Sequence, residues 1–246
     1  MSLKKFFLRS NFTYKIYLYY NLYIRHKCFL NRNQYSQWGE DLIIKEFFKD
    51  KKAGIYFDVG CFHPIMYSNT CALFKKGWRG INIDINPTSV DLFNIVRPND
   101  LNLCTTINEN PKEFKIFFDH PFSPVNTLDE TFYKDFKKSY LKKFKKDSYV
   151  GGIEKKIKSQ TIDEILKKFD SYDKVDFLNI DVEGMDLKIL RQLIPHKLTP
   201  SLISIETHSP DSKKLRDCDE INRYLIGNNY AVFKRVGPTT LFSVNK

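Results

Sequence analysis

The sequence lacks the cysteine pairs and the long apolar runs that identify several classes of protein. Its five cysteines are odd in number and contain no C-x-x-C spacing, which argues against a disulfide framework or a zinc ribbon and fits a reducing cytoplasm. The apolar run between Lys15 and Arg25 is too short to span a bilayer, and no small-residue cleavage site follows it. We therefore expect neither a transmembrane helix nor a signal peptide.

Motifs for binding pyrophosphate and nucleic acid are missing as well. The chain has no G-x-G-x-x-G turn, and its candidate nucleotide loop has one glycine, Gly60, followed by the residues CFHP without lysine or arginine. Such a loop is a poor cradle for pyrophosphate but tolerates a nucleoside without phosphates. No RNA-binding signature or zinc finger occurs, so we expect no nucleic-acid partner.

Positive charge, by contrast, is abundant. Lysine and arginine number 40 against 29 aspartates and glutamates, which gives a formal net charge of +11 over 246 residues. A chain of this length forms one large domain, or one domain with appendages. The basic balance favours acidic partners such as sugar nucleotides, anionic lipid headgroups or nucleic acid.

The first 39 residues contain no acid, whereas lysines and arginines punctuate an aromatic stretch, FTYKIYLYYNLYI. We separate residues 1–34, a basic aromatic segment, from residues 35–246, one α/β domain. The segment could lie on an anionic membrane surface, cover a partner subunit, or fold its tyrosines back over the sheet as a helix. We expect a cytoplasmic protein, which the first alternative would place at the inner face of the membrane.

Residues 55–85, IYFDVGCFHPIMYSNTCALFKKGWRGINIDI, predict a strand–helix–strand unit. Two apolar runs end in Asp58 and Asp84, as parallel strands buried on both faces do. Residues 68–70, Ser-Asn-Thr, offer side chains to cap the helix between them, and Gly77 ends it. Ligands of open α/β sheets bind beyond the carboxyl ends of the strands, where Asp84 suits a ribose diol.

A second stretch, VDFLNIDVEGMDLKIL, predicts another buried strand with Asp181 and Glu183 at its tip. The nearby LISIETH predicts a further strand that ends at Glu206 and His208. Acids at four strand ends are more than unselected strand ends would supply. The carboxyl edge of the sheet is therefore expected to form one site. The four acids are Asp58, Asp84, Asp181 and Glu206.

Several motifs together resemble the FkbM family of S-adenosylmethionine-dependent methyltransferases, over roughly residues 35–244. They are FDVGCFHP, SNT and GWRGINIDINP, with YSQWGED upstream and FLNIDVEGMDLKIL downstream. The resemblance implies a class I methyltransferase fold, a Rossmann-like doubly wound sheet that is mostly parallel with one antiparallel strand. It also implies O-methylation of a sugar in surface polysaccharide biosynthesis. The alternatives are a nucleic-acid methyltransferase and a non-catalytic membrane-associated scaffold. Cys61 and Phe62 depart from the family pattern.

The resemblance also implies site residues. The expected S-adenosylmethionine-binding residues are Gln37, Asp58, Gly60, Asn69, Asp84, Ile85 and Asp181. A sugar hydroxyl that accepts a methyl group must lose its proton, so it needs a general base or a metal. The candidate bases are His208, His63 and Glu183, and Asp181 with Glu206 could hold Mg²⁺ or Mn²⁺. The basic surface predicts an anionic substrate, a sugar nucleotide or a glycan.

Overall fold

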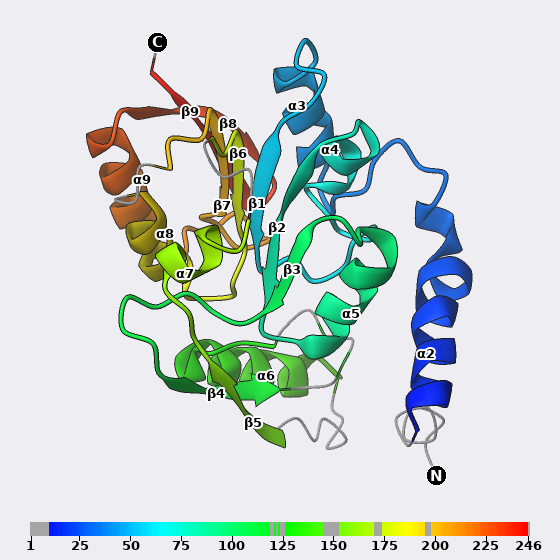
Figure 1. The fold of residues 1–246 in the computed structure, drawn as a ribbon. Helices are drawn as coiled ribbons and strands as arrows, with labels where there is room; N and C mark the ends of the chain where they lie inside the picture. The colour runs from blue at the N-terminus through cyan, green and yellow to red at the C-terminus, as the bar shows by residue number, and fades with distance from the viewer. Residues whose placement is uncertain are drawn as a thin grey trace.

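A seven-stranded sheet lies at the centre of the structure, which is a computed structural model (Figure 1). The model describes residues 10–118, 121, 123, 126–144, 153–169, 174–194 and 198–245. The strand order is β3-β2-β1-β6-β7-β9-β8, and only β9 runs antiparallel to its neighbours β7 and β8. This confirms the mostly parallel sheet with one antiparallel strand. The strands are β1 Ile55–Val59, β2 Arg79–Asp84, β3 Leu101–Cys104, β6 Phe177–Ile180, β7 Leu202–Glu206, β8 Tyr230–Val236 and β9 Thr239–Val244.

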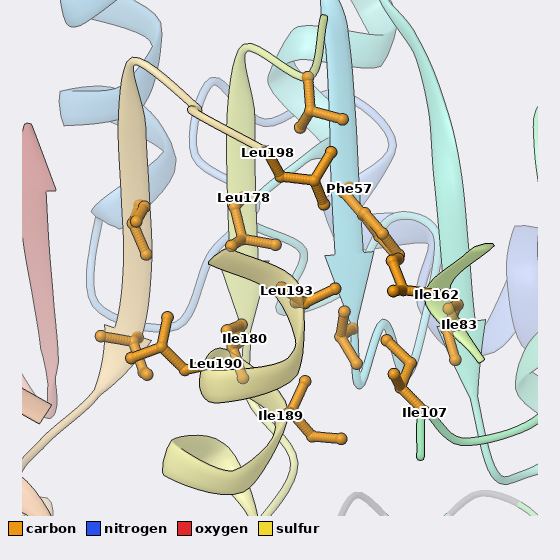
Figure 2. Packing of buried hydrophobic residues seen from close by; sticks show 14 of the residues in the cluster. Phe57, Ile83, Ile107, Ile162, Leu178, Ile180, Ile189, Leu190, Leu193 and Leu198 are labelled. Carbon is orange, nitrogen blue, oxygen red and sulfur yellow. The ribbon is translucent and has the colours of Figure 1, made fainter. Parts of the chain in front are cut away.

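Helices cover both faces of this sheet, as in a doubly wound fold. One face packs against α7 (Ile162–Leu166), α8 (Asp186–Leu193) and α9 (Cys218–Gly227), and the other against α3 (Glu40–Phe47) and α4 (Cys71–Lys75). The first face is filled by branched aliphatic side chains from the strands and from α8 (Figure 2). Since side chains alternate along a strand, the second face receives Tyr56 and Asp58 of β1.

The remaining elements flank the carboxyl edge and one side of the sheet. A small antiparallel sheet joins β4 (Glu113–Phe118) and β5 (Ile153–Lys158), and α6 (Glu130–Phe144) follows β4. Helix α5 (Pro87–Val96) follows β2. Its start agrees with the sequence, because the Asn86 side chain accepts a hydrogen bond from the Thr88 amide and Pro87 takes the first helical position.

The helix caps show where local sequence patterns hold and where they fail. Thr161 and Glu164 form the expected capping box of α7. At α4, however, the prediction that Ser68, Asn69 and Thr70 cap the helix is wrong, because no side chain caps its amino end. These three polar groups instead make hydrogen bonds to residues distant in sequence, and that places them at the centre of the fold.

The basic aromatic segment folds into α2 (Asn11–Tyr20), a π-helix (Asn21–Arg25) and a 3₁₀ turn (Lys27–Phe29). Leu18 and Leu22 are buried in a cluster with Leu92 of α5 and residues of α4. The Tyr14 hydroxyl donates to an Asp91 carboxylate oxygen at 2.7 Å, which fixes α2 alongside α5 (Figure 1). One face of the segment therefore packs onto the body, but against α4 and α5 and not over the sheet, and Tyr19, Tyr20 and Tyr23 stay exposed, which differs from the alternative in which the tyrosines fold back over the sheet.

A buried guanidinium joins the loop after β1 to the strands. Arg97 follows α5 and is completely buried. Its Nη1 donates to the hydroxyls of Thr70 (2.9 Å) and Tyr56 (3.1 Å). Its Nη2 donates to the Pro64 carbonyl (2.6 Å) and the Ser68 hydroxyl (3.1 Å). One side chain thus fixes the backbone and two hydroxyls of residues 64–70.

The positive charge of Arg97 is balanced through those hydroxyls. Thr70 donates to a carboxylate oxygen of Asp58 at 2.6 Å, and Tyr56 donates to Asp100. Aromatic rings enclose the guanidinium, with centroids 4.7 Å (Phe93) and 5.0 Å (Phe74) from its central carbon. Buried charge is tolerated when it is paired and hydrogen-bonded, and both terminal nitrogens of Arg97 are satisfied, whereas its Nε has no hydrogen-bond partner among the described residues. Because these groups depend on one another, the network should form or break as a unit.

We predict that Arg97→Met lowers the free energy of unfolding by roughly 3–5 kcal/mol, because it leaves two carboxylates and several hydroxyls without a cationic partner. Urea denaturation measures this loss. The matched control is Arg79→Met, at an exposed arginine of β2, which should change the free energy by less than about 0.5 kcal/mol. Equal effects of the two substitutions would show that the buried network does not stabilise the fold.

Candidate functional site

Two adjoining pockets open at the carboxyl ends of β1, β2, β6 and β7. They share Gly60, Phe62, Asp181 and Glu183. The first, which we name the apolar pocket, spans about 580 Å³ including its opening to solvent. Its apolar side chains come from Val59, Phe62, Ile83, Ile85, Leu128, Val182, Met185 and Ile189, and its polar ones from Asp84, Thr105, Thr106, Ser123, Asn126, Asp181 and Glu183. The second, the carboxylate pocket, encloses about 750 Å³. Its polar lining residues are Gln37, Glu40, Asp58, Ser68, Asn69, Asn179, Asp181, Glu183, Glu206 and Thr239.

Gly60 sets the distance between the ends of β1 and β6. Its φ is +81°, and a Cβ at this position would lie 1.8 Å from the Asp181 carbonyl oxygen. Its amide donates to the Ile83 carbonyl at 2.9 Å, which ties the turn to β2 as well. No residue with a side chain fits there without moving the backbone. The close approach brings the tips of three strands around the shared part of the pockets.

Asp84 lies at the tip of β2 and lines the apolar pocket beside Ile85. Its Oδ2 accepts a hydrogen bond from the Phe62 amide (2.8 Å) and its Oδ1 one from the Asn86 amide (2.7 Å). Burial raises the pKa of Asp84 to about 6, although these amide hydrogen bonds act in the opposite direction. Each carboxylate oxygen keeps a further lone pair, so the group can still accept a hydrogen bond from a ligand.

Asp58 is buried and accepts hydrogen bonds from two neighbouring side chains. Its two oxygens accept hydrogen bonds from Thr70 Oγ1 (2.6 Å) and Asn179 Nδ2 (2.9 Å). The Asn179 side-chain oxygen in turn accepts from Asn69 Nδ2 at 3.0 Å. Burial raises the pKa of Asp58, and these hydrogen bonds lower it. Asp58 therefore lines the carboxylate pocket and also fixes the two amides that border it.

Three acids face one another in the carboxylate pocket. Burial raises the pKa of Asp181 to about 7 and that of Glu206 to about 9, and neighbouring carboxylates add to both shifts. Burial and the charge of Asp181 raise the pKa of Glu183 well above its ordinary value. The Asp181 side chain is nevertheless exposed to water at the pocket, which weakens the effect of burial on its pKa. Within the described part of the chain, no lysine or arginine lines this pocket.

The backbone at Glu183 is held in an unusual conformation. Its φ is +53°, the left-handed region that side chains disfavour. The Thr127 hydroxyl donates to the Glu183 carbonyl at 2.9 Å, and Asp186 accepts weak hydrogen bonds from the Val182 and Gly184 amides. Phe62, on the opposite side of both pockets, also has a positive φ of 48°. Strain at pocket-lining residues is typical of ligand-binding sites.

The YSQWGED motif forms the start of α3 and one wall of the carboxylate pocket. The Ser36 hydroxyl accepts from the Gly39 and Asp41 amides, at 3.0 and 3.2 Å. Glu40 accepts from the Trp38 amide at 2.8 Å and from the Thr239 hydroxyl at 3.2 Å. This compact turn presents Gln37, Trp38 and Glu40 to the pocket.

The structure brings most of the predicted residues together but not the histidines. His63 is buried: Nδ1 accepts hydrogen bonds from the Ile65 and Met66 amides (3.1 and 2.9 Å), and Nε2 contacts Asn21 Oδ1 at 3.1 Å. Burial lowers the pKa of His63 to about 3, which makes it a weak base. Both ring nitrogens already have hydrogen-bond partners, so neither is free to take a proton from a substrate. His208 contacts the Thr207 hydroxyl at 2.8 Å and lines neither pocket.

The other predicted residues occupy the two pockets. Gln37, Asp58, Asn69 and Glu206 line the carboxylate pocket, and Asp84 and Ile85 line the apolar pocket. Three residues that line or support the carboxylate pocket were not predicted from the sequence. Glu40 lies within a motif that was noted for other reasons, whereas Asn179 and Arg97 act through partners more than 20 residues away, which no local pattern reveals.

The predicted metal pair, Asp181 and Glu206, is not joined by a third ligand in the part of the chain that the structure describes. Among the residues described, no group of three or more histidine, cysteine, aspartate or glutamate side chains is arranged to hold one ion. The two carboxylates do line the same pocket. Their arrangement suits a positively charged or hydrogen-bond-donating ligand.

A third pocket, between α6 and α9, meets the carboxylate pocket at Glu206 and encloses about 760 Å³. Phe132, Leu215 and Ile221 form its apolar wall. Arg216 also lines it and contacts Asp129 at 3.4 Å, a long ion pair between an exposed arginine and a mostly buried aspartate.

We predict that Glu206→Gln makes the folded protein more stable than the natural protein, by an amount that grows as pH rises. The folded-state pKa of Glu206 is raised, so its stability contribution is complete below the unfolded pKa of about 4.5 and is lost as pH rises toward 9. Glutamine cannot ionise. The variant should melt about 2–4 °C above the natural protein at pH 8, a gain of roughly 1 kcal/mol, and the difference should vanish near pH 4.5.

Thermal melting across this pH range checks the prediction. Glu46→Gln, at an exposed glutamate of α3 that pairs with Lys49, is the matched control and should show no comparable gain at pH 8. A melting-temperature difference for Glu206→Gln that does not change with pH would contradict the proposed charge repulsion.

A family model described as the methyltransferase FkbM domain matches residues 58–233 of this chain. No curated protein matches the chain. The matched region begins inside β1, ends inside β8, and includes the tips of all four acid-bearing strands. Because the match covers more than half of the 246 residues, the chain belongs to the FkbM methyltransferase family.

Proposed function

We propose that the protein binds S-adenosylmethionine across the apolar and carboxylate pockets and transfers its methyl group to a sugar hydroxyl. The observation that carries the proposal is the arrangement of the two pockets around the shared strand tips. An adenine ring fits an aliphatic pocket with a few polar groups, and Asp84 at its edge suits the ribose diol. The methionine end then occupies the carboxylate pocket.

The charge of the carboxylate pocket supports this cofactor. S-adenosylmethionine carries a positive sulfonium, a positive ammonium group and one carboxylate, so its net charge is positive, and the described lining of the pocket holds several acids and no lysine or arginine. A bound cation favours the ionised carboxylates and lowers these pKa values. The pyrophosphate of NAD would instead meet several acids and no basic side chain of the described lining.

When bound, S-adenosylmethionine supplies the methyl group, whose carbon–sulfur bond breaks as the bond to the acceptor oxygen forms. The protein orients the acceptor and removes its proton. We infer that Glu206 takes this proton, because it lies where the carboxylate pocket meets the third pocket. Glu183, held by its strained turn, lies on the cofactor side. In the charged complex the Glu206 carboxylate is ionised and can accept the proton.

The third pocket is the proposed place for the sugar. Its apolar wall suits the face of a sugar ring, and its carboxylate side chains can accept hydrogen bonds from sugar hydroxyls. Its acids, Asp129, Asp135, Asp186, Glu206 and Asp217, outnumber the one arginine of the described lining, so the charge of the pocket does not itself favour an anionic group. A nucleotide-linked or glycan-bound sugar of surface polysaccharide synthesis is the acceptor class that the family resemblance implied.

We predict that Asp84 recognises the ribose diol. The natural protein should bind S-adenosylhomocysteine roughly tenfold or more tightly than its 2′-deoxy analogue, because a charge-assisted hydrogen bond contributes about 1.5–3 kcal/mol. In Asp84→Asn this preference should fall to near unity. Calorimetry of both ligands with both proteins separates a lost ribose contact from general damage, which would weaken both ligands equally and leave the preference intact.

The acceptor reaction has its own test. Glu206→Gln should lower kcat for methylation of a sugar nucleotide or glycan by about two to four orders of magnitude, since a general base is lost. Its affinity for S-adenosylhomocysteine, which lacks the sulfonium charge, should change little. His208→Ala, outside all three pockets, is the control and should retain kcat.

These assays are run with and without a chelator. Loss of turnover on chelation, with recovery in Mg²⁺ or Mn²⁺, would assign Asp181 and Glu206 to a metal in place of a base. Methylation found only on RNA, with none on any sugar nucleotide or glycan tested, would overturn the sugar assignment and favour a nucleic-acid substrate.

A further inference from the structure

The outer face of the amino-terminal helices exposes an unusual amount of apolar surface. Phe12 is 74% exposed and Ile24 is 60% exposed. The exposed large side chains recur at positions i, i+4, i+7, i+8, i+11 and i+12, so they form one continuous stripe along the helix. This set, which we name the outer stripe, consists of Phe12, Ile16, Tyr19, Tyr20, Tyr23 and Ile24.

The opposite face of the same helices is anchored to the protein. Tyr17, Leu18 and Leu22 are buried, and Tyr14 and Asn21 make hydrogen bonds to Asp91 and His63. The burial of one face determines which side chains remain outside. In Figure 1, α2 lies at the edge of the molecule, beside α5 and away from the sheet. The outer stripe is therefore held facing away from the body.

Charge distinguishes the possible occupants of this surface. Lys15, Arg25 and Lys27 are exposed within or directly after the helices, and the sequence has no acid before Glu40. Two copies of the chain meeting through the outer stripe would bring like charges together, with no acid in the segment to pair them. An anionic lipid surface would neutralise those charges, and tyrosines suit the boundary between headgroups and acyl chains.

We propose that the outer stripe docks on an anionic membrane surface, with the helices lying in the plane of the lipid headgroups. Within the residues described, no helix has both the length and the apolar character needed to cross a bilayer. Burial of the aliphatic and aromatic side chains supplies the apolar contribution to docking, and the basic side chains supply the electrostatic one. The proposal does not depend on the identity of the methyl acceptor.

Co-sedimentation of the full chain with vesicles tests the proposal. The protein should sediment with vesicles of phosphatidylglycerol and phosphatidylcholine in equal parts, and much less with phosphatidylcholine alone. High salt should weaken the binding, since charge screening acts on the basic side chains. Lys15→Glu should weaken it about tenfold or more, because the substitution changes two units of charge at the surface.

A matched pair of variants tests the apolar contribution. Ile24→Ser should weaken vesicle binding about tenfold, whereas Ile226→Ser should not change it. Ile226 is 58% exposed, close to the value for Ile24, but it lies on α9 on the other side of the molecule (Figure 1). Both residues are on the surface, so both variants should fold, which circular dichroism verifies.

Three outcomes would overturn the proposal. The first is equal binding to vesicles with and without phosphatidylglycerol, and the second is equal loss of binding in Ile24→Ser and Ile226→Ser. The third is a dimer that forms without vesicles and dissociates in Ile24→Ser, measured by sedimentation equilibrium. That result would assign the outer stripe to a second copy of the chain.

Discussion

The site depends on a single buried cation, the guanidinium of Arg97. It holds the loop after β1 by the Pro64 carbonyl and by two hydroxyls, and one of these, that of Thr70, donates to Asp58. Asp58 then fixes Asn179 on the neighbouring strand. Each of these groups is hydrogen-bonded to the next, so one network joins the loop after β1 to the wall of the carboxylate pocket.

In the described lining of the carboxylate pocket, unlike around Arg97, the charged groups are not paired with groups of opposite charge. Asp181, Glu183 and Glu206 lie together without basic partners in the lining, so their negative charges disfavour one another. Such a cluster lowers the stability of the folded protein above pH 7. The cation near β1 therefore stabilises the scaffold, while the carboxylate pocket has acids and no basic side chain in its described lining.

The sequence predicts elements and their tips well, because buried parallel strands are continuous apolar runs that end in polar residues. The acids at 58, 84, 181 and 206 all reach the pockets as expected. The roles of the short polar groups could not be predicted. A Ser-Asn-Thr run before a helix has the composition of a cap, and only the distant partners Arg97 and Asn179 explain why it bonds elsewhere. For His63, a loop position beside the expected site gave no sign that neighbouring amides occupy its ring nitrogen.

The amino-terminal segment shows why its alternatives could not be separated from sequence. Apolar side chains surround α2, so periodicity identifies no single buried face. The structure buries one side against α5 and leaves the other side exposed. This arrangement has a consequence for the site. Phe29, just beyond the helices, packs edge-on against Tyr67, which lines the carboxylate pocket. Because the segment is fixed to the body, a membrane bound to its outer face would determine the orientation of the pocket relative to the lipid surface.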